Sequence, residues 1–304
     1  MAIADIQHNK VVRDIIKKGK WQHPAFVKAV WDDGEKAPTK FLVGARMFFD
    51  NSEVPILTNK IVHELNARRE LFWIWVYKSH RLTDLRKLGV KFWNKWEIKE
   101  GEWKGTIGPA YGYQLGKVCR KFLKSKVRRE HLNPNATYIE DDTYIHLDQV
   151  DWLIQTLLTN PWSRHKVTSL WGVEDLDEMK LPPCVWNTTW VYDGELLHLK
   201  VGIRSNDIAL GNPFNVYQYY VLQRMICQVT GHGLGTLEFK IDDAHLYDRH
   251  IEVANKQANA QMHEAPELWI NPEVKNFYEF DLDKDFELRN YNATASFKYE
   301  LAEA

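Results

Sequence analysis

The chain has 304 residues, a formal net charge of −1, 27% charged residues and 44% hydrophobic residues. This composition excludes a disordered chain and disfavours a protein that coats nucleic acid, and the length suffices for a substantial buried core. Its 3 cysteines form no Cys-x-x-Cys pair, so neither a disulfide framework nor a four-cysteine metal site is indicated. The sequence contains no secretory pattern at the N-terminus and no apolar run long enough to cross a bilayer, so we expect a cytoplasmic protein.

Hydrophobic periodicity and turn residues predict a mixture of helices and strands along the chain. Helices are predicted at residues 9–20, 60–79 and 148–158, and strands at residues 167–171, 185–191 and 196–203. Asp193-Gly194 between the last two strands indicates a hairpin. A long buried helix at 216–230, capped by Asn215 and closed by Gly231, precedes a strand at 236–241 and a helix at 250–261. Hairpin-paired strands beside central helices are typical of an α+β fold, and no linker or repeat divides the chain, so we expect a single domain over residues 1–304.

Three other stretches suggest functions that we weigh against simpler explanations. The basic residues between Lys117 and Arg129 could bind nucleic acid, but a near-zero net charge favours a solvated helix face or a mobile loop. Residues 105–112 contain three glycines without a phosphate-loop or dinucleotide pattern, and this indicates a shaped turn. The order of Cys227, His232, His245 and His250 is similar to that of a zinc finger, but the second cysteine of a zinc finger is absent. We therefore predict no metal site from these residues.

Cys184 is the strongest candidate for a catalytic residue. It ends the motif Leu181-Pro182-Pro183-Cys184, and the run Arg204 to Asn215 follows about twenty residues later. A thiol is a nucleophile, an Arg-Ser pair can bind an anion, and an asparagine amide can read the edge of a planar heterocycle. These residue types together predict an enzyme that acts on a nucleotide.

Several motifs, in this order along the chain, resemble one family. They are residues 50–58 (DNSEVPILT), 105–112 (GTIGPAYG), 181–184 (LPPC), 204–215 (RSNDIALGNPFN), 245–247 (HLY) and 264–274 (EAPELWINPEV). The combination resembles the thymidylate synthases, specifically the type found in bacilli and some of their phages, and the likeness runs from about Ile15 to Phe280. The resemblance implies a thymidylate-synthase-type α+β fold, with a mixed, mainly antiparallel sheet packed by helices and a homodimer formed sheet to sheet.

The resemblance also implies a reaction and its cosubstrate. Cys184 is expected to add to C6 of dUMP, and a one-carbon unit from 5,10-methylenetetrahydrofolate then goes to C5, giving dTMP and dihydrofolate. A sister activity, hydroxymethylation of dUMP or dCMP, uses the same scaffold and lets water capture the methylene intermediate. The retained bulk of Trp93 favours the synthase. A third alternative is a catalytically silent homologue that binds nucleotide or RNA, and the intact Cys184, Asn215 and Glu70 disfavour it.

Individual roles follow from the same resemblance. The implied catalytic residues are Cys184, Glu70, Tyr111 and Asp207, with Glu70 moving protons through ordered water. Arg204 and Ser205 are expected to bind the phosphate, and the Arg204 cation to lower the pKa of the thiol. The remaining implied ligands are Asn215 for the base, His245 and Tyr247 for the sugar, and Trp93, Asp207, Gly211 and Phe214 for the folate.

The partner subunit is expected to contribute to the phosphate site through Arg164 and His165. The family usually has two arginines there, and another where this chain has Lys28. Other departures are Asn94, Gly172, Val185 after the nucleophile, and Asp242-Asp243-Ala244. The chain also ends one residue beyond the family's usual end, which puts closure of the C-terminus over folate in question. No metal, membrane or nucleic acid is expected as a partner.

Overall fold

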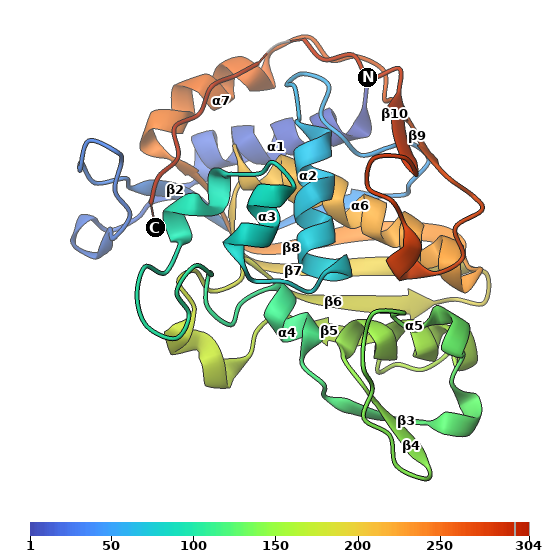
Figure 1. The fold of residues 1–304 in the computed structure, drawn as a ribbon. Helices are drawn as coiled ribbons and strands as arrows, with labels where there is room; N and C mark the ends of the chain where they lie inside the picture. The colour runs from blue at the N-terminus through green and yellow to red at the C-terminus, as the bar shows by residue number, and fades with distance from the viewer. Residues whose placement is uncertain (295, 304) are drawn as a thin grey trace.

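A mixed sheet forms the centre of the molecule in the computed structural model, which describes residues 1–294 and 296–303 (Figure 1). Its strand order is β1-β2-β8-β7-β6-β5, and every neighbouring pair is antiparallel except β7 and β8. The α+β class with a mainly antiparallel sheet is therefore confirmed. The strands are β1 (Lys20–Trp21), β2 (Thr39–Phe49), β5 (Val167–Ser169), β6 (Val185–Tyr192), β7 (Leu196–Asp207) and β8 (Gly233–Tyr247).

The parallel pair β7 and β8 is joined by the long helix α6 (Gly211–Thr230). Parallel strands need such a crossover, whereas β6 and β7 are joined by the short turn at Asp193-Gly194 that the sequence predicted. Alternate residues of β7 face the core, and Leu197, Leu199, Val201 and Ile203 are almost fully buried. The register fixes which strand ends meet, and this determines where the site forms.

Helices α1 (Ile3–Lys18), α2 (Glu64–Leu71) and α6 lie together beside the sheet (Figure 1). Most of α6 is buried, which explains why its apolar side chains are not confined to one stripe of the helix. Helix α2 continues into a π-helical turn at Phe72–Val76. The large buried side chains Trp73, Trp75, Trp190 and Tyr217 fill the core, so much of the high tryptophan content serves packing.

Shorter elements complete the chain. The remaining helices are α3 (Leu82–Lys87), α4 (Gly112–Gly116), α5 (Gln149–Thr159) and α7 (Ile251–Ala258). Two antiparallel pairs lie outside the main sheet, β3 (Arg120–Leu123) with β4 (Tyr144–Leu147) and β9 (Glu267–Ile270) with β10 (Phe286–Arg289). Short 3-10 helices occur at Pro24–Phe26, Phe92–Trp96, Lys124–Lys126, Arg129–His131, Val173–Glu178, Asp248–His250 and Phe277–Glu279.

Several predicted boundaries are wrong. Helix α1 begins at Ile3 rather than residue 9, because buried Asp5 and His8 broke the apolar pattern, and α7 ends at Ala258 rather than residue 261. Helix α6 starts at Gly211, so Asn215 lies inside the helix and does not cap it. The basic stretch after Lys117 is an exposed strand and a 3-10 turn, not a helix face.

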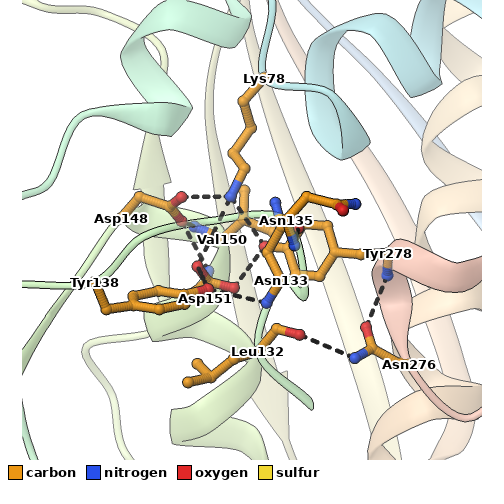
Figure 2. A network of polar contacts seen from close by, with 10 residues as sticks. All are labelled: Lys78, Leu132, Asn133, Asn135, Tyr138, Asp148, Val150, Asp151, Asn276 and Tyr278. Carbon is orange, nitrogen blue, oxygen red and sulfur yellow. Dashed lines mark hydrogen bonds and ion pairs between the residues drawn. The ribbon is translucent and has the colours of Figure 1, made fainter. Parts of the chain in front are cut away.

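A buried polar network holds the β3–β4 region and α5 to the rest of the molecule (Figure 2). Lys78, which follows α2 and its π-turn, bonds to Asp148 and lies 3.8 Å from Asp151. Asp151 accepts hydrogen bonds from the hydroxyls of Tyr138 (2.9 Å) and Tyr278 (2.6 Å), which come from two distant segments. Because Asp151 is fully buried and its oxygens are paired, the network pins three segments together.

Candidate active site

A pocket of about 410 Å³ opens at the ends of β7 and β8. All of the predicted site residues line it except Lys28, Arg164 and His165. The sequence-derived members of the lining are Glu70, Trp93, Tyr111, Cys184, Arg204, Ser205, Asp207, Gly211, Phe214, Asn215, His245 and Tyr247. Tertiary structure thus gathers residues that are up to 177 positions apart, counted from Glu70 to Tyr247.

Strand register brings the nucleophile to the nucleotide-binding motif. Cys184 immediately precedes β6, and its carbonyl accepts a hydrogen bond from the backbone N–H of Arg204 in β7 at 2.9 Å. The parallel pairing then places Asp207 opposite His245 of β8. One end of three neighbouring strands therefore carries the thiol, the cation and the polar residues of the HLY motif.

Arg204 lines the pocket and also binds the backbone of the Pro182-Pro183-Cys184 segment. Its Nε donates to the carbonyl of Pro183 at 3.0 Å and an Nη donates to the carbonyl of Pro182 at 2.7 Å. A guanidinium has five N–H donors, so donors remain for a phosphate. The fixed fork orients the Pro-Pro-Cys segment and the anion site relative to each other.

The groups around Cys184 do not bring the pKa of its thiol below the usual value. Burial raises its pKa above the usual range, although the Arg204 cation and a hydrogen bond with Tyr111 both act in the opposite direction. The expected lowering by Arg204 is present, but burial outweighs it. The free protein therefore holds Cys184 mainly as the thiol at neutral pH.

Tyr111 lies within the glycine-rich segment, which is a turn as predicted. Its φ of 50° is unusual for a residue with a side chain, and its hydroxyl accepts a hydrogen bond from the backbone N–H of Cys184 at 3.1 Å. Gly108 (φ +80°) could not carry a side chain, since a Cβ there would lie 2.2 Å from the carbonyl of Glu178. Strained backbone of this kind is maintained by surrounding contacts and is common at functional sites.

Glu70 is a buried carboxylate that faces the pocket from α2. One oxygen accepts a hydrogen bond from the indole of Trp93 and the other accepts from Gln218 Nε2 of α6 at 2.5 Å. Burial raises its pKa to about 7, even though both donors favour the ionised form. A carboxylate poised near neutrality can accept or release a proton at physiological pH.

Asp207 lies at the end of β7, next to the start of α6. Its carboxylate accepts hydrogen bonds from the backbone N–H groups of Ala209 (2.8 Å) and Leu210 (3.1 Å). His250 Nδ1 lies 4.0 Å away, while its Nε2 faces the carbonyl of Glu300 at 2.8 Å. These contacts fix the carboxylate in the lining of the pocket, where it can accept a hydrogen bond from a ligand.

The polar wall consists of Asn215, His245 and Tyr247. His245 Nδ1 lies 2.6 Å from a carboxylate oxygen of Asp243, and its ring packs edge-on against Tyr247 at 5.4 Å. Asn215 accepts a hydrogen bond from the amide of Asn206 at 3.0 Å. All three side chains are therefore held in place by protein contacts before any ligand binds.

Aromatic rings form another part of the lining, which we call the aromatic wall. Trp93 packs edge-on against Tyr111 (5.2 Å) and Trp96 (5.4 Å), and Phe92 packs against Phe214 (5.7 Å). Among the residues that the structure describes, no group accepts a hydrogen bond from the buried indole N–H of Trp96. A flat ligand with acceptor atoms suits this wall.

The C-terminal segment closes one side of the pocket through Leu301 and Ala302. The backbones of Val30 and Glu303 exchange two hydrogen bonds of 2.9 Å. Arg249 bridges Asp33, Glu35 and Glu300, and this ion-pair network holds the same segment. The terminal carboxylate belongs to Ala304, which lies outside the described residues, so its predicted part in closure is untested.

Three predicted phosphate ligands lie elsewhere on the chain. Lys28 is exposed in the loop after the first 3-10 helix, and Arg164 and His165 are exposed in the turn before β5. None of them lines the pocket of its own chain. Their roles remain predictions, and for Arg164 and His165 the predicted role is in the site of a partner subunit.

The sequence reasoning missed several lining residues. They are Phe92, Trp96, Leu181, Asn206, Leu210, Leu301 and Ala302. Asn206 lies between two predicted ligands, and Phe92 and Trp96 flank Trp93, so proximity in sequence was an available signal. Within residues 1–294 and 296–303, no group of three or more His, Cys, Asp or Glu side chains could hold a metal ion, and no helix is long and apolar enough to cross a membrane.

Comparison with known proteins agrees with this geometry. The family model for thymidylate synthase matches residues 6–303. Thymidylate synthases from Bacillus subtilis subsp. natto and from Bacillus phage phi3T are each 47% identical over 299 residues, covering 98% of this chain and of theirs. The solved structure of thermostable thymidylate synthase A from Bacillus subtilis is 46% identical, with a TM-score of 0.86 over 99% of both chains. The chain therefore belongs to the thymidylate synthase family.

Proposed function

We propose that this protein methylates dUMP at C5, using 5,10-methylenetetrahydrofolate as cosubstrate, through a covalent bond between Cys184 and C6 of the base. The observation that carries the proposal is the convergence of Cys184, Arg204, Asn215 and Glu70 on one pocket of a thymidylate synthase fold. The enzyme acts as a single catalytic domain in the cytoplasm.

The first step needs a thiolate at Cys184, which forms when the thiol releases its proton to solvent. Its sulfur adds to C6, and the electron pair of the C5–C6 double bond moves onto C5 and the O4 carbonyl. Asn215 donates an amide N–H to O4 and so stabilises the negative charge that develops there. The Arg204 cation offsets the negative charge of the buried thiolate. C5 then attacks the one-carbon unit, and Glu70, poised near neutrality, takes part in the proton transfers at the base.

The folate cosubstrate fits the aromatic side of the pocket. The indole N–H of Trp96, which has no acceptor among the described residues, and the carboxylate of Asp207 supply a donor and an acceptor for a pterin ring. A Cβ on Gly211 would meet only the side chains of Asn206 and Asn215, at 3.6 and 3.9 Å, so its missing side chain leaves room on the pocket side. When bound, the folate supplies the one-carbon unit and the hydride that reduces it to a methyl group.

The packing of the aromatic wall supports methylation over hydroxymethylation. Water must reach the exocyclic methylene group if it is to form a hydroxymethyl product. Trp93 is 7% exposed and is held by its hydrogen bond to Glu70 and by the rings of Tyr111 and Trp96. A fixed indole excludes water from that region and leaves hydride transfer as the outcome.

The predicted homodimer is supported by the exposed side of the sheet. Phe48 (52% exposed) and Val191 (41% exposed) alternate with the buried Phe49 and Trp190, so they point away from the core. A second copy would cover such side chains. In that dimer, Arg164 and His165 would reach the phosphate site of the partner chain and join its Arg204 and Ser205.

One incubation tests the activity and its alternatives. Purified protein is mixed with dUMP and methylenetetrahydrofolate, dihydrofolate formation is followed, and the nucleotide is identified by mass. Dihydrofolate with dTMP supports the proposal, whereas 5-hydroxymethyl-dUMP with unoxidised tetrahydrofolate would make the protein a hydroxymethylase. Failure to release tritium from 5-tritiated dUMP would show a catalytically silent homologue.

A further inference from the structure

A row of three asparagine side chains runs from the buried Asn212 through Asn206 to Asn215, the predicted reader of the nucleotide base. Asn212 Nδ2 donates to Asn206 Oδ1 at 2.8 Å, and Asn206 Nδ2 donates to Asn215 Oδ1 at 3.0 Å. Asn206 and Asn212 are 2% and 1% exposed. Asn215 and Asn206 line the pocket, whereas Asn212 does not.

The row has a direction, because each amide donates to the oxygen of the next. Among the described residues, Asn212 Oδ1 has no hydrogen-bond partner. Reversing all three amides would instead leave the Asn212 NH₂ group, with two donors, unpaired in the interior. An unpaired buried donor is less tolerated than an unpaired carbonyl oxygen, so the observed direction is the favoured one.

The direction determines what Asn215 presents to a base. Its oxygen is engaged by Asn206 and keeps one lone pair, while its nitrogen keeps both hydrogens. Uracil has an acceptor at O4, which can accept from the Asn215 nitrogen, and a donor at N3, which can donate to the Asn215 oxygen. Cytosine offers a donor at N4 and an acceptor at N3, so it would require Asn215 to turn over.

We propose that Asn206 and Asn212 are specificity-determining positioning residues, which lock the amide of Asn215 in the orientation that reads uracil and rejects cytosine. The inference rests on the proposed role of Asn215 in binding the base of dUMP. Turning Asn215 over would place its NH₂ against the NH₂ of Asn206, and two facing donors repel. To remove this repulsion, Asn206 and then Asn212 would have to turn over as well.

The test measures dissociation constants for dUMP and dCMP by calorimetry, alongside kcat/KM for both nucleotides. In Asn206→Ala the lock is absent, and the preference for dUMP over dCMP should fall by about tenfold, the effect of one mismatched donor and acceptor pair. Asn206→Ser, which is smaller but polar, serves as a second variant if the alanine protein does not fold.

Asn212→Asp tests the direction of the row without touching the pocket. A carboxylate at this position only accepts, so Asn206 turns its NH₂ toward it and presents its oxygen to Asn215. The preference for dUMP should then fall below that of the matched control Asn212→Ala, with measurements at pH 8.5 to favour the ionised acid. Equal losses of dUMP and dCMP affinity in Asn206→Ala, or equal preferences in Asn212→Asp and Asn212→Ala, would overturn the proposal.

The wild-type protein and Asn215→Asp separate this inference from the proposed function. If wild type converts dUMP and Asn215→Asp moves preference toward dCMP, while the variants at 206 and 212 keep the wild-type preference, the row is structural and the enzyme assignment stands. If wild type neither binds nor converts dUMP, the proposed function itself fails.

Discussion

Replacing Gln218 with methionine should move the pH dependence of the enzyme without altering the pocket wall. Gln218 is buried in α6, donates to Glu70 at 2.5 Å, and is not among the residues that line the pocket. Methionine has a similar volume and no donor, so it keeps the packing and removes this hydrogen bond, together with the one that Gln218 donates to the carbonyl of Ala67 at 3.0 Å. Within the described part of the chain, the donor to Glu70 that remains is the indole of Trp93.

The magnitude follows from the strength of a hydrogen bond to a charged group. Such a bond contributes about 1.5–3 kcal/mol, and 1.36 kcal/mol corresponds to one pKa unit. The pKa of Glu70 is about 7, so half of the molecules are ionised at pH 7. Without the Gln218 donor the ionised fraction at pH 7 should fall to between about one tenth and one hundredth, which lowers the rate about 5- to 50-fold.

The assay is kcat/KM for dUMP from pH 6 to 9.5, followed by dihydrofolate formation. Wild type should rise through pH 7, and Gln218→Met should rise one to two pH units later and approach wild type at the alkaline end. Gln223→Met is the matched control, because Gln223 is equally buried in α6 but donates only to the backbone of Leu197, Gly235 and Thr236. Profiles of kcat/KM that rise at the same pH for Gln218→Met and wild type would refute the reasoning, and so would faster turnover of Gln218→Met at pH 7.

Three further results are expected. Cys184→Ser should lose turnover by more than about 10³-fold while binding dUMP within about tenfold of wild type, since the alcohol is a poor nucleophile and the other contacts remain; activity within tenfold of wild type would remove Cys184 from the mechanism. His165→Arg should lower the KM for dUMP about fivefold, because a guanidinium can bind a phosphate through two N–H groups, and an unchanged KM would show that His165 does not reach the phosphate. Lys78→Met should lower the free energy of unfolding by about 3 kcal/mol in denaturant titrations, because it leaves the buried Asp151 without its cation. Loss of the exposed ion pair in Lys10→Met should cost less than about 1 kcal/mol, and equal losses in the two lysine variants would contradict the buried network.

Sequence alone determined the elements whose signals lie within a few residues. Helix α5 begins after Asp148, whose carboxylate accepts from two backbone N–H groups of the first turn. Helix α6 ends at Gly231 in the left-handed conformation, and the hairpin forms at Asp193-Gly194. These features depend on local backbone chemistry, so their residues predict them without reference to the rest of the chain.

The sequence also indicated most of the site, but through motifs rather than through geometry. Cys184 and the run from Arg204 to Asn215 carry recognisable chemistry, and they do line one pocket. Gln218 carries no such signal, because glutamine is common in helices for many reasons, and the residue type of Asn206 does not indicate its role within the run. The importance of both residues depends on which side chain they face.

Only the tertiary structure decided which of these side chains contact one another. Gln218 meets Glu70 across 148 residues of sequence, and Tyr111 meets Cys184 across 73. Parallel pairing of β7 with β8 brings Asp207 beside His245, and burial rather than neighbouring charge sets the pKa values of Glu70 and Cys184. Strand register and desolvation are properties of the folded chain, because they depend on residues that are close in space but distant in sequence.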